Sequence, residues 1–172
     1  MSTIRIDEEF SSGMYFLTLT VLHWYYLFDR WNRFDILLDS LKHCQKHKEL
    51  KVYAWVFMIN HIHLIAASED MIGFTRDFKK FTSKELQKNI VATEPSILKI
   101  FEEKGEYHFW QPKNMPKVIE TEEYFLQKKN YIEQNPVKKL YVRNPEHWIY
   151  SSANPESLLQ LDNPNDWFNL QN

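Results

Sequence analysis

Glycine and cysteine are both scarce in this 172-residue chain. Only three glycines occur, well below the usual share of roughly 7%, and neither a GxGxxG nor a GxxxxGKS/T motif is present. The single cysteine, Cys44, leaves no disulfide framework and no CxxC metal site, which fits a reducing cytoplasm. These absences argue against nucleotide-driven chemistry and against metal sites built from thiolates.

Long apolar runs are also missing. The longest, at 53–59, is far too short to cross a bilayer, and the first residues lack the basic-then-apolar layout of a signal peptide. We therefore expect a cytoplasmic protein that does not associate with membranes. A formal net charge of -2 argues, on bulk charge alone, against a strongly basic nucleic-acid binder.

Aromatic side chains, in contrast, are abundant and make up 16% of the chain. That content excludes disorder as a global description, and a length near that of a typical domain predicts a single core. We assign 1–153 to one domain. We assign 154–172, which contain Pro155 and Pro164, to a C-terminal tail of uncertain structure.

The hydrophobic periodicity predicts alternating strands and helices. The expected elements are a strand at 14–22, a helix at 29–48, strands at 51–58 and 61–67, a helix at 74–90, a short strand at 117–120 and a helix at 121–135. The last helix is expected to end before Pro136, since a proline disfavours helical geometry in the preceding residue. This order predicts an α+β, ferredoxin-like βαββαβ antiparallel sheet with helices on one face and an added C-terminal helix.

Two histidines on the third predicted strand are candidate metal ligands. His61 and His63 are separated by one residue, so on a strand both side chains point to the same face. Two neighbouring imidazoles are able to share one cation. The alternative is that both simply lie on a solvated strand face.

A second cluster of candidate residues lies at the end of the last predicted helix. Tyr131 and Asn135 are four residues apart on one helical face, with Gln134 beside them. A tyrosine hydroxyl is able to act as a covalent nucleophile, and either amide offers an oxygen that completes a metal site. The alternative role for Tyr131 is packing on the sheet.

Together these motifs resemble the HUH superfamily of single-strand transposases, and most of all the REP-associated tyrosine transposases. The resemblance covers about 15–153 and depends on the order of several blocks rather than on any one of them. The blocks are Tyr15-Phe-Leu-Thr-Leu-Thr20, the histidine-containing stretch 53–64, the basic stretch 76–84, Phe109-Trp-Gln111, the tyrosine-containing stretch 131–137 and Trp148-Ile-Tyr-Ser-Ser-Ala153.

The resemblance implies a function and a set of roles. His61, His63 and Asn135 would hold a divalent metal, Mg²⁺ or Mn²⁺, and Tyr131 would be the nucleophile that forms a 5′-phosphotyrosine with DNA. The implied partner is single-stranded DNA with hairpin or repeat structure, and the protein would act as a monomer or a homodimer. Either Asn135 or Gln134 remains open as the third ligand.

Local charge changes the conclusion drawn from the net charge. Residues 72–88 carry five Lys or Arg against two acids, and 128–143, which surround Tyr131, carry five against one. Such segments suit the neutralisation of DNA phosphates, and an aromatic side chain such as Trp110 is suited to stacking on unpaired bases. The predicted DNA-binding residues are Arg76, Lys79, Lys80, Lys84, Lys128 and Trp110.

Three functions are compatible with these features. The leading hypothesis is a metal-dependent tyrosine transposase that nicks and transfers DNA strands. The first alternative is a non-catalytic, single-stranded nucleic-acid-binding module that uses the same ferredoxin-like fold. The second is a hydrolytic metallonuclease in which Tyr131 is structural.

Overall fold

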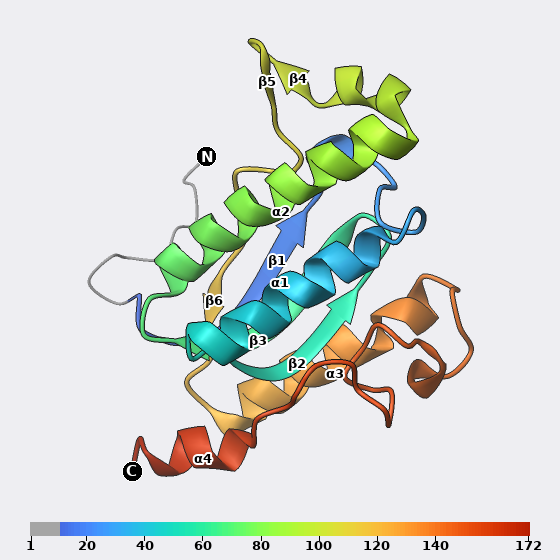
Figure 1. Ribbon diagram of the computed structural model, residues 1–172. Helices are drawn as coiled ribbons and strands as arrows, with labels where there is room; N and C mark the ends of the chain where they lie inside the picture. The colour runs from blue at the N-terminus through green and yellow to red at the C-terminus, as the bar shows by residue number, and fades with distance from the viewer. Residues whose placement is uncertain (1–10) are drawn as a thin grey trace.

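A four-stranded antiparallel sheet organises the molecule, for which a computed structural model describes residues 11–172. The spatial order of the strands is β2-β3-β1-β6 (Figure 1). The strands are β1 (Gly13–Thr20), β2 (Lys51–Phe57), β3 (His61–Ser68) and the short edge strand β6 (Lys117–Val118). With the helices that connect them, they form the predicted ferredoxin-like βαββαβ arrangement.

The central pair, β1 and β3, determines which side chains share a face. Thr20 lies opposite His61 and Thr18 lies opposite His63. Directly opposed side chains in an antiparallel pair point to the same face of the sheet. Strand β2 pairs with the other edge of β3, and a register shift between Val52 and Ala54 marks a bulge. The strands on either side of Asn60 thus form a bulged antiparallel pair, as the predicted antiparallel sheet requires.

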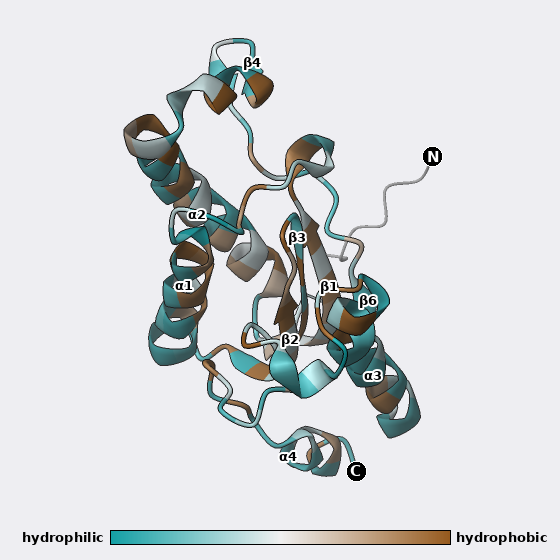
Figure 2. Ribbon diagram, turned by 90° about the vertical axis from the view of Figure 1, so that its right-hand side faces the viewer, coloured by the Kyte–Doolittle hydropathy of each residue, from teal (hydrophilic) through white to brown (hydrophobic). Residues whose placement is uncertain are grey.

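Helices cover both faces of the sheet (Figure 2). The helices α1 (Arg33–His47) and α2 (Met71–Thr93) lie on one face and bury apolar residues such as Leu37, Leu41 and Phe78 against it. The helix α3 (Glu122–Lys138) lies on the opposite face, where Phe125 and Ile132 pack on a second apolar cluster. The sheet is thus enclosed between two helical layers, and the predicted additional helix, α3, lies on the side opposite α1 and α2.

Helix α1 begins four residues later than the periodicity predicts. Trp31 and Asn32 adopt left-handed backbone conformations, with φ of 58° and 57°. A helix cannot propagate through left-handed residues, so Arg33 is its first residue.

Helix α3 continues past Pro136 to Lys138, and its predicted end at 135 was wrong. A proline inside a helix removes one N–H donor and crowds the preceding turn. Here Pro136 lies in the last turn, and the helix end is closed by the N–H groups of Lys139 and Tyr141, which donate to Asn135 O and Pro136 O. Asn135 is therefore a helical residue, held in register with Tyr131.

The remaining segments extend this core. The 3-10 turns are η2 (Leu22–Trp24), η3 (Pro95–Ile100) and η4 (Pro145–His147), and a small hairpin is formed by β4 (Glu102–Glu103) and β5 (Glu106–Tyr107). The C-terminal segment forms the short helix α4 (Pro164–Asn169), whose Phe168 contacts Phe125 of α3. None of the helices in 11–172 is long and apolar enough to span a membrane.

Candidate functional site

The sheet face beneath α3 contains a cavity of about 400 Å³. Strand β1, strand β3, helix α3, the turn η2 and the approach to β6 all contribute side chains to it. Among residues 11–172, those that line it are Phe16, Thr18, Trp24, His61, His63, Met115, Lys117, Lys128, Tyr131, Asn135 and Lys139. Three of these are lysines and none is acidic, so the cavity favours an anion such as a phosphodiester.

His63 lies deep in this cavity, with only 4% of its surface exposed. Its ring stacks on Phe16 with the centroids 5.4 Å apart. Its Nδ1 is 2.9 Å from Thr18 Oγ1, in the hydrogen bond that the β1–β3 register allows. Its Nε2 is buried and has no hydrogen-bond partner within the described residues. A buried nitrogen without a partner is costly, and a bound cation would satisfy it.

His61 is arranged in the same way, one pleat along β3. Its ring centroid is 4.8 Å from that of His63, and its Nδ1 is 2.7 Å from Asn60 Oδ1. A second hydrogen bond supports this assignment of the Asn60 amide oxygen and nitrogen, because Asn60 Nδ2 donates to Trp24 O at 3.0 Å. An amide oxygen only accepts, so Nδ1 of His61 carries the proton and Nε2 keeps its lone pair. An imidazole that binds a metal through Nε2 requires this tautomer.

Burial lowers the pKa of both imidazoles. The pKa of His61 falls to about 4 through desolvation, with a further contribution from Lys139. The pKa of His63 falls to about 3 through desolvation, together with the charges of His61 and Lys128. Both rings are therefore neutral near pH 7, and neutral imidazole is the form that binds metals.

These pKa values predict a loss of stability in acid for the metal-free protein. Both folded-state values lie below the usual 6.5, so the unfolded chain binds more protons once the pH falls below about 6.5. Their contribution is complete above that pH and is lost as the pH falls toward 4 and then 3. Between pH 7 and pH 5 we expect a loss on the order of 2 kcal/mol per histidine. Urea unfolding with a chelator measures it.

The matched control for this prediction is the double variant His61→Gln, His63→Gln. Without the two imidazoles, the free energy of unfolding should change much less over the same pH range. An equally steep pH dependence in the double variant would assign the acid sensitivity to other groups.

Helix α3 brings Tyr131 over the histidine pair. The Tyr131 ring is 40% exposed and meets the His63 ring edge-to-face, with the centroids 5.4 Å apart. Lys128 Nζ and Lys138 Nζ lie 5.5 and 5.4 Å from the centre of the Tyr131 ring. A partly exposed phenol ring with two ammonium groups near it is well placed to meet a phosphate from solvent.

Asn135 enters the same cavity one helical turn after Tyr131 and is buried there, whereas Gln134 is not among the lining residues. The geometry thus favours Asn135 as the amide beside the histidines. In the described part of the chain, no group of three or more His, Cys, Asp or Glu side chains is placed to hold a metal. Any metal in this cavity would therefore depend on two imidazoles and an amide oxygen.

The predicted DNA-binding residues are divided between the two faces of the sheet. Lys128 lines the cavity with Tyr131. Arg76, Lys80 and Lys84 are exposed on α2, across the sheet, and Arg76 Nε is 3.0 Å from Asp77 Oδ1. Lys128 and the three α2 residues therefore lie on opposite faces of the sheet. One DNA strand would contact both only if it passed around the edge of the sheet.

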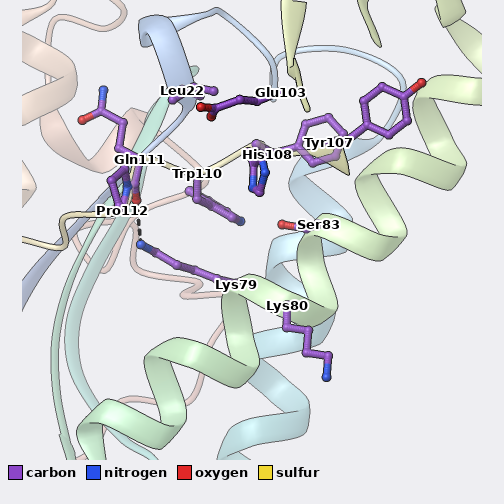
Figure 3. Close-up of a pocket in the computed structure, with 11 residues that line it drawn as sticks. Leu22, Lys79, Lys80, Ser83, Glu103, Tyr107, His108, Trp110, Gln111 and Pro112 are labelled. Atoms are coloured by element: carbon purple, nitrogen blue, oxygen red, sulfur yellow. Dashed lines mark hydrogen bonds between the residues drawn. The ribbon is translucent and has the colours of Figure 1, made fainter. Parts of the chain in front are cut away.

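A second pocket, between α2 and 107–112, is lined by three of the predicted residues, Lys79, Lys80 and Trp110 (Figure 3). Lys79 Nζ donates to Gln111 O at 2.7 Å, and burial lowers the pKa of this lysine to about 8. Trp110 is 6% exposed, packs against Phe78, and donates from Nε1 to Thr82 Oγ1. Only a small part of the Trp110 ring is left exposed for stacking on a base, because the ring contacts Phe28 and Phe78.

Several cavity residues were not identified from the sequence. Thr18 and Asn60 orient the two imidazoles, and Trp24, Met115 and Lys139 line the walls. The period-2 alternation of β1 places Thr18 on one face, but only the register with β3 shows that His63 is its neighbour. No local signal marks the other residues.

The sequence matches no model of a known protein family and no curated protein. Several solved structures resemble the fold, and two of them are transposases. A REP-associated tyrosine transposase bound to a REP hairpin superposes with a TM-score of 0.68 at 20% identity, covering 88% of this chain and 82% of the other. A candidate transposase from Deinococcus radiodurans R1 has a TM-score of 0.50 at 18% identity, covering 78% and 97%. The chain therefore shares the fold of a REP-associated tyrosine transposase.

Proposed function

We propose that this protein is a REP-associated tyrosine transposase, which cleaves and rejoins single-stranded DNA at hairpin-forming repeats. The observation that carries the proposal is the meeting of Tyr131 with His61, His63 and Asn135 in one lysine-lined cavity. The transposase of the same fold, which is bound to a REP hairpin, supports a hairpin DNA as the partner.

The donor set fits a divalent cation. Within 11–172, His63 Nε2 is buried without a hydrogen-bond partner. His61 Nε2 keeps its lone pair, and Asn135 offers an amide oxygen in the same cavity. Two nitrogens and one oxygen suit Mn²⁺ and, less closely, Mg²⁺. When bound, the cation polarises the scissile phosphate and stabilises charge on its oxygens.

The residues of the chain itself would perform the remaining steps. Lys117, Lys128 and Lys139 attract the DNA backbone into the cavity. The Tyr131 oxygen attacks phosphorus, a P–O bond to Tyr131 forms, and the P–O3′ bond breaks. The phenol proton is released and the departing 3′ oxygen takes up a proton, so the products are a 5′-phosphotyrosine and a free 3′-OH. A second 3′-OH is able to reverse the step without an external energy source.

One protomer contains all of these groups. Tyr131 lies 5.4 Å, ring centre to ring centre, from His63 of the same chain. We therefore propose that cleavage takes place within one subunit, and that a monomer is competent for it.

The test is an adduct assay. The protein is incubated with hairpin-containing single-stranded DNA and Mn²⁺, and the products are separated on a denaturing gel. A covalent protein–DNA adduct is the expected result, and it should disappear when a chelator replaces the metal. Cleavage without an adduct would identify a hydrolytic nuclease instead, and binding without cleavage would identify the non-catalytic module.

A further inference from the structure

The turn between β1 and α1 contains two consecutive bulky residues in a disfavoured conformation. His23 and Trp24 have φ of 59° and 57°. Left-handed backbone is uncommon for any residue other than glycine, and bulky side chains rarely adopt it. Such strain persists only where surrounding contacts enforce it, and it occurs preferentially at functional sites.

The contact that holds this turn comes from the histidine motif. Asn60 Nδ2 donates to Trp24 O at 3.0 Å, while Asn60 Oδ1 accepts from His61 Nδ1 at 2.7 Å. The Asn60 backbone also takes part, because its carbonyl accepts from Val21 N. The position of Trp24 is thus coupled, through one amide side chain, to the position of a candidate metal ligand.

The Trp24 indole is not part of the apolar core. Its surface is 58% exposed, although it lines the cavity and meets the His61 ring edge-to-face with the centroids 6.3 Å apart. Proteins that bind single-stranded nucleic acids stack unpaired bases on exposed aromatic rings near positive charge. The Trp24 ring is such a ring, because it is exposed to solvent beside a lysine-lined cavity.

We infer that Trp24 is the stacking platform for one unpaired nucleobase next to the phosphate that lies in the cavity. The stacked base would hold the single strand so that its phosphate stays over His61 and His63. The inference rests on the proposed function for its substrate class. It assigns to Trp24 the role that the sequence suggested for Trp110, whose ring is buried.

Trp31 provides a matched control on the same connection. It is 52% exposed and has φ of 58°, so it shares both the exposure and the backbone conformation of Trp24. Its carbonyl accepts from Asn89 Nδ2, and it does not line the cavity. A general effect of removing an exposed tryptophan from a strained turn should therefore appear equally at Trp31.

The experiment measures binding of a labelled DNA hairpin with a single-stranded flank, by fluorescence anisotropy, in the presence of a chelator so that no cleavage occurs. Each flank position is replaced in turn by an abasic nucleotide. We expect Trp24→Ala to weaken binding about tenfold, Trp24→Phe to retain most of the affinity, and Trp31→Ala to bind as the parent does. If Trp24→Ala fails to fold, the affinities of Trp24→Phe and Trp24→Leu are compared instead, and the aromatic variant should bind the DNA more tightly.

The decisive result is coupling between the protein change and the DNA change. One abasic position should weaken binding by the parent protein about tenfold and should have no further effect on Trp24→Ala. The inference would be overturned if Trp24→Ala bound the DNA as tightly as the parent protein. It would also be overturned if every abasic position weakened binding by Trp24→Ala as much as it weakens binding by the parent protein. Coupling without any covalent adduct in Mn²⁺ would overturn the proposed chemistry and leave the base platform standing. A covalent adduct without coupling would support the proposed chemistry and overturn the base platform at Trp24.

Discussion

Tyr131→Phe is expected to abolish the covalent protein–DNA adduct and to lower strand cleavage by at least about 1,000-fold, because loss of a covalent nucleophile has effects of this size or larger. The substitution removes one oxygen atom and leaves the ring that contacts Phe16 and His63. Because this side chain is partly exposed, the fold should tolerate the change. The assay is the denaturing gel with hairpin DNA and Mn²⁺, quantified over time.

Tyr124→Phe is the matched control. Tyr124 lies on the same helix, and Lys128 Nζ is 5.4 Å from the centre of its ring, yet it does not line the cavity. This variant should form the adduct at the parental rate. If Tyr131→Phe still formed the adduct, the nucleophile would have to be another residue, and the chemistry proposed for α3 would be wrong.

His63→Leu is expected to lower metal-dependent adduct formation by more than about 100-fold. This residue supplies the buried Nε2 that has no hydrogen-bond partner in the described part of the chain. Loss of a residue that only orients a metal ligand lowers metal affinity 10- to 100-fold, and loss of the ligand itself should lower it more. Leucine keeps the site filled with an apolar side chain, so folding is preserved better than with alanine. Mn²⁺ titration followed by electron paramagnetic resonance measures the affinity directly.

A graded series distinguishes ligand loss from general damage. Thr18→Val removes the hydrogen bond to His63 Nδ1 but leaves the imidazole in place, so its effect on Mn²⁺ affinity should fall in the 10- to 100-fold range. His43→Gln, at an exposed position of α1, should leave the affinity unchanged. Equal Mn²⁺ affinity in His63→Leu and the parent protein would remove His63 from the ligand set.

The local elements of the fold were predictable because each has a strong hydrophobic period. Strands β2 and β3 begin where the apolar runs predict, and the antiparallel pairing across Asn60 follows from a turn residue between those two runs. The end of α3 was not predictable from a local rule. The preference against helix before proline is overridden by packing, since Ile132 packs in the apolar cluster beneath α3 and Pro136 is also buried.

The functional assignment of side chains was less predictable than the fold. Charge spacing placed Arg76, Lys80 and Lys84 together, yet α2 covers the face of the sheet opposite the histidines. Aromatic content alone does not distinguish a platform from a core residue. Trp110 is packed against Phe78, while Trp24 stands exposed at the cavity.

Two relations in the site follow from the amino-acid sequence without any tertiary information. His61 and His63 share one face of a strand, and Tyr131 and Asn135 share one face of a helix, because each relation depends only on the period of its element. The tertiary structure decided that these two faces meet. Burial of Phe125 and Ile132 against the sheet directs α3 onto the histidine side, and the β1–β3 register brings Thr18 to His63. The scarcity of glycine and cysteine had excluded phosphate loops and thiolate sites, but contacts between distant segments are what gather imidazole, amide and phenol into one cavity.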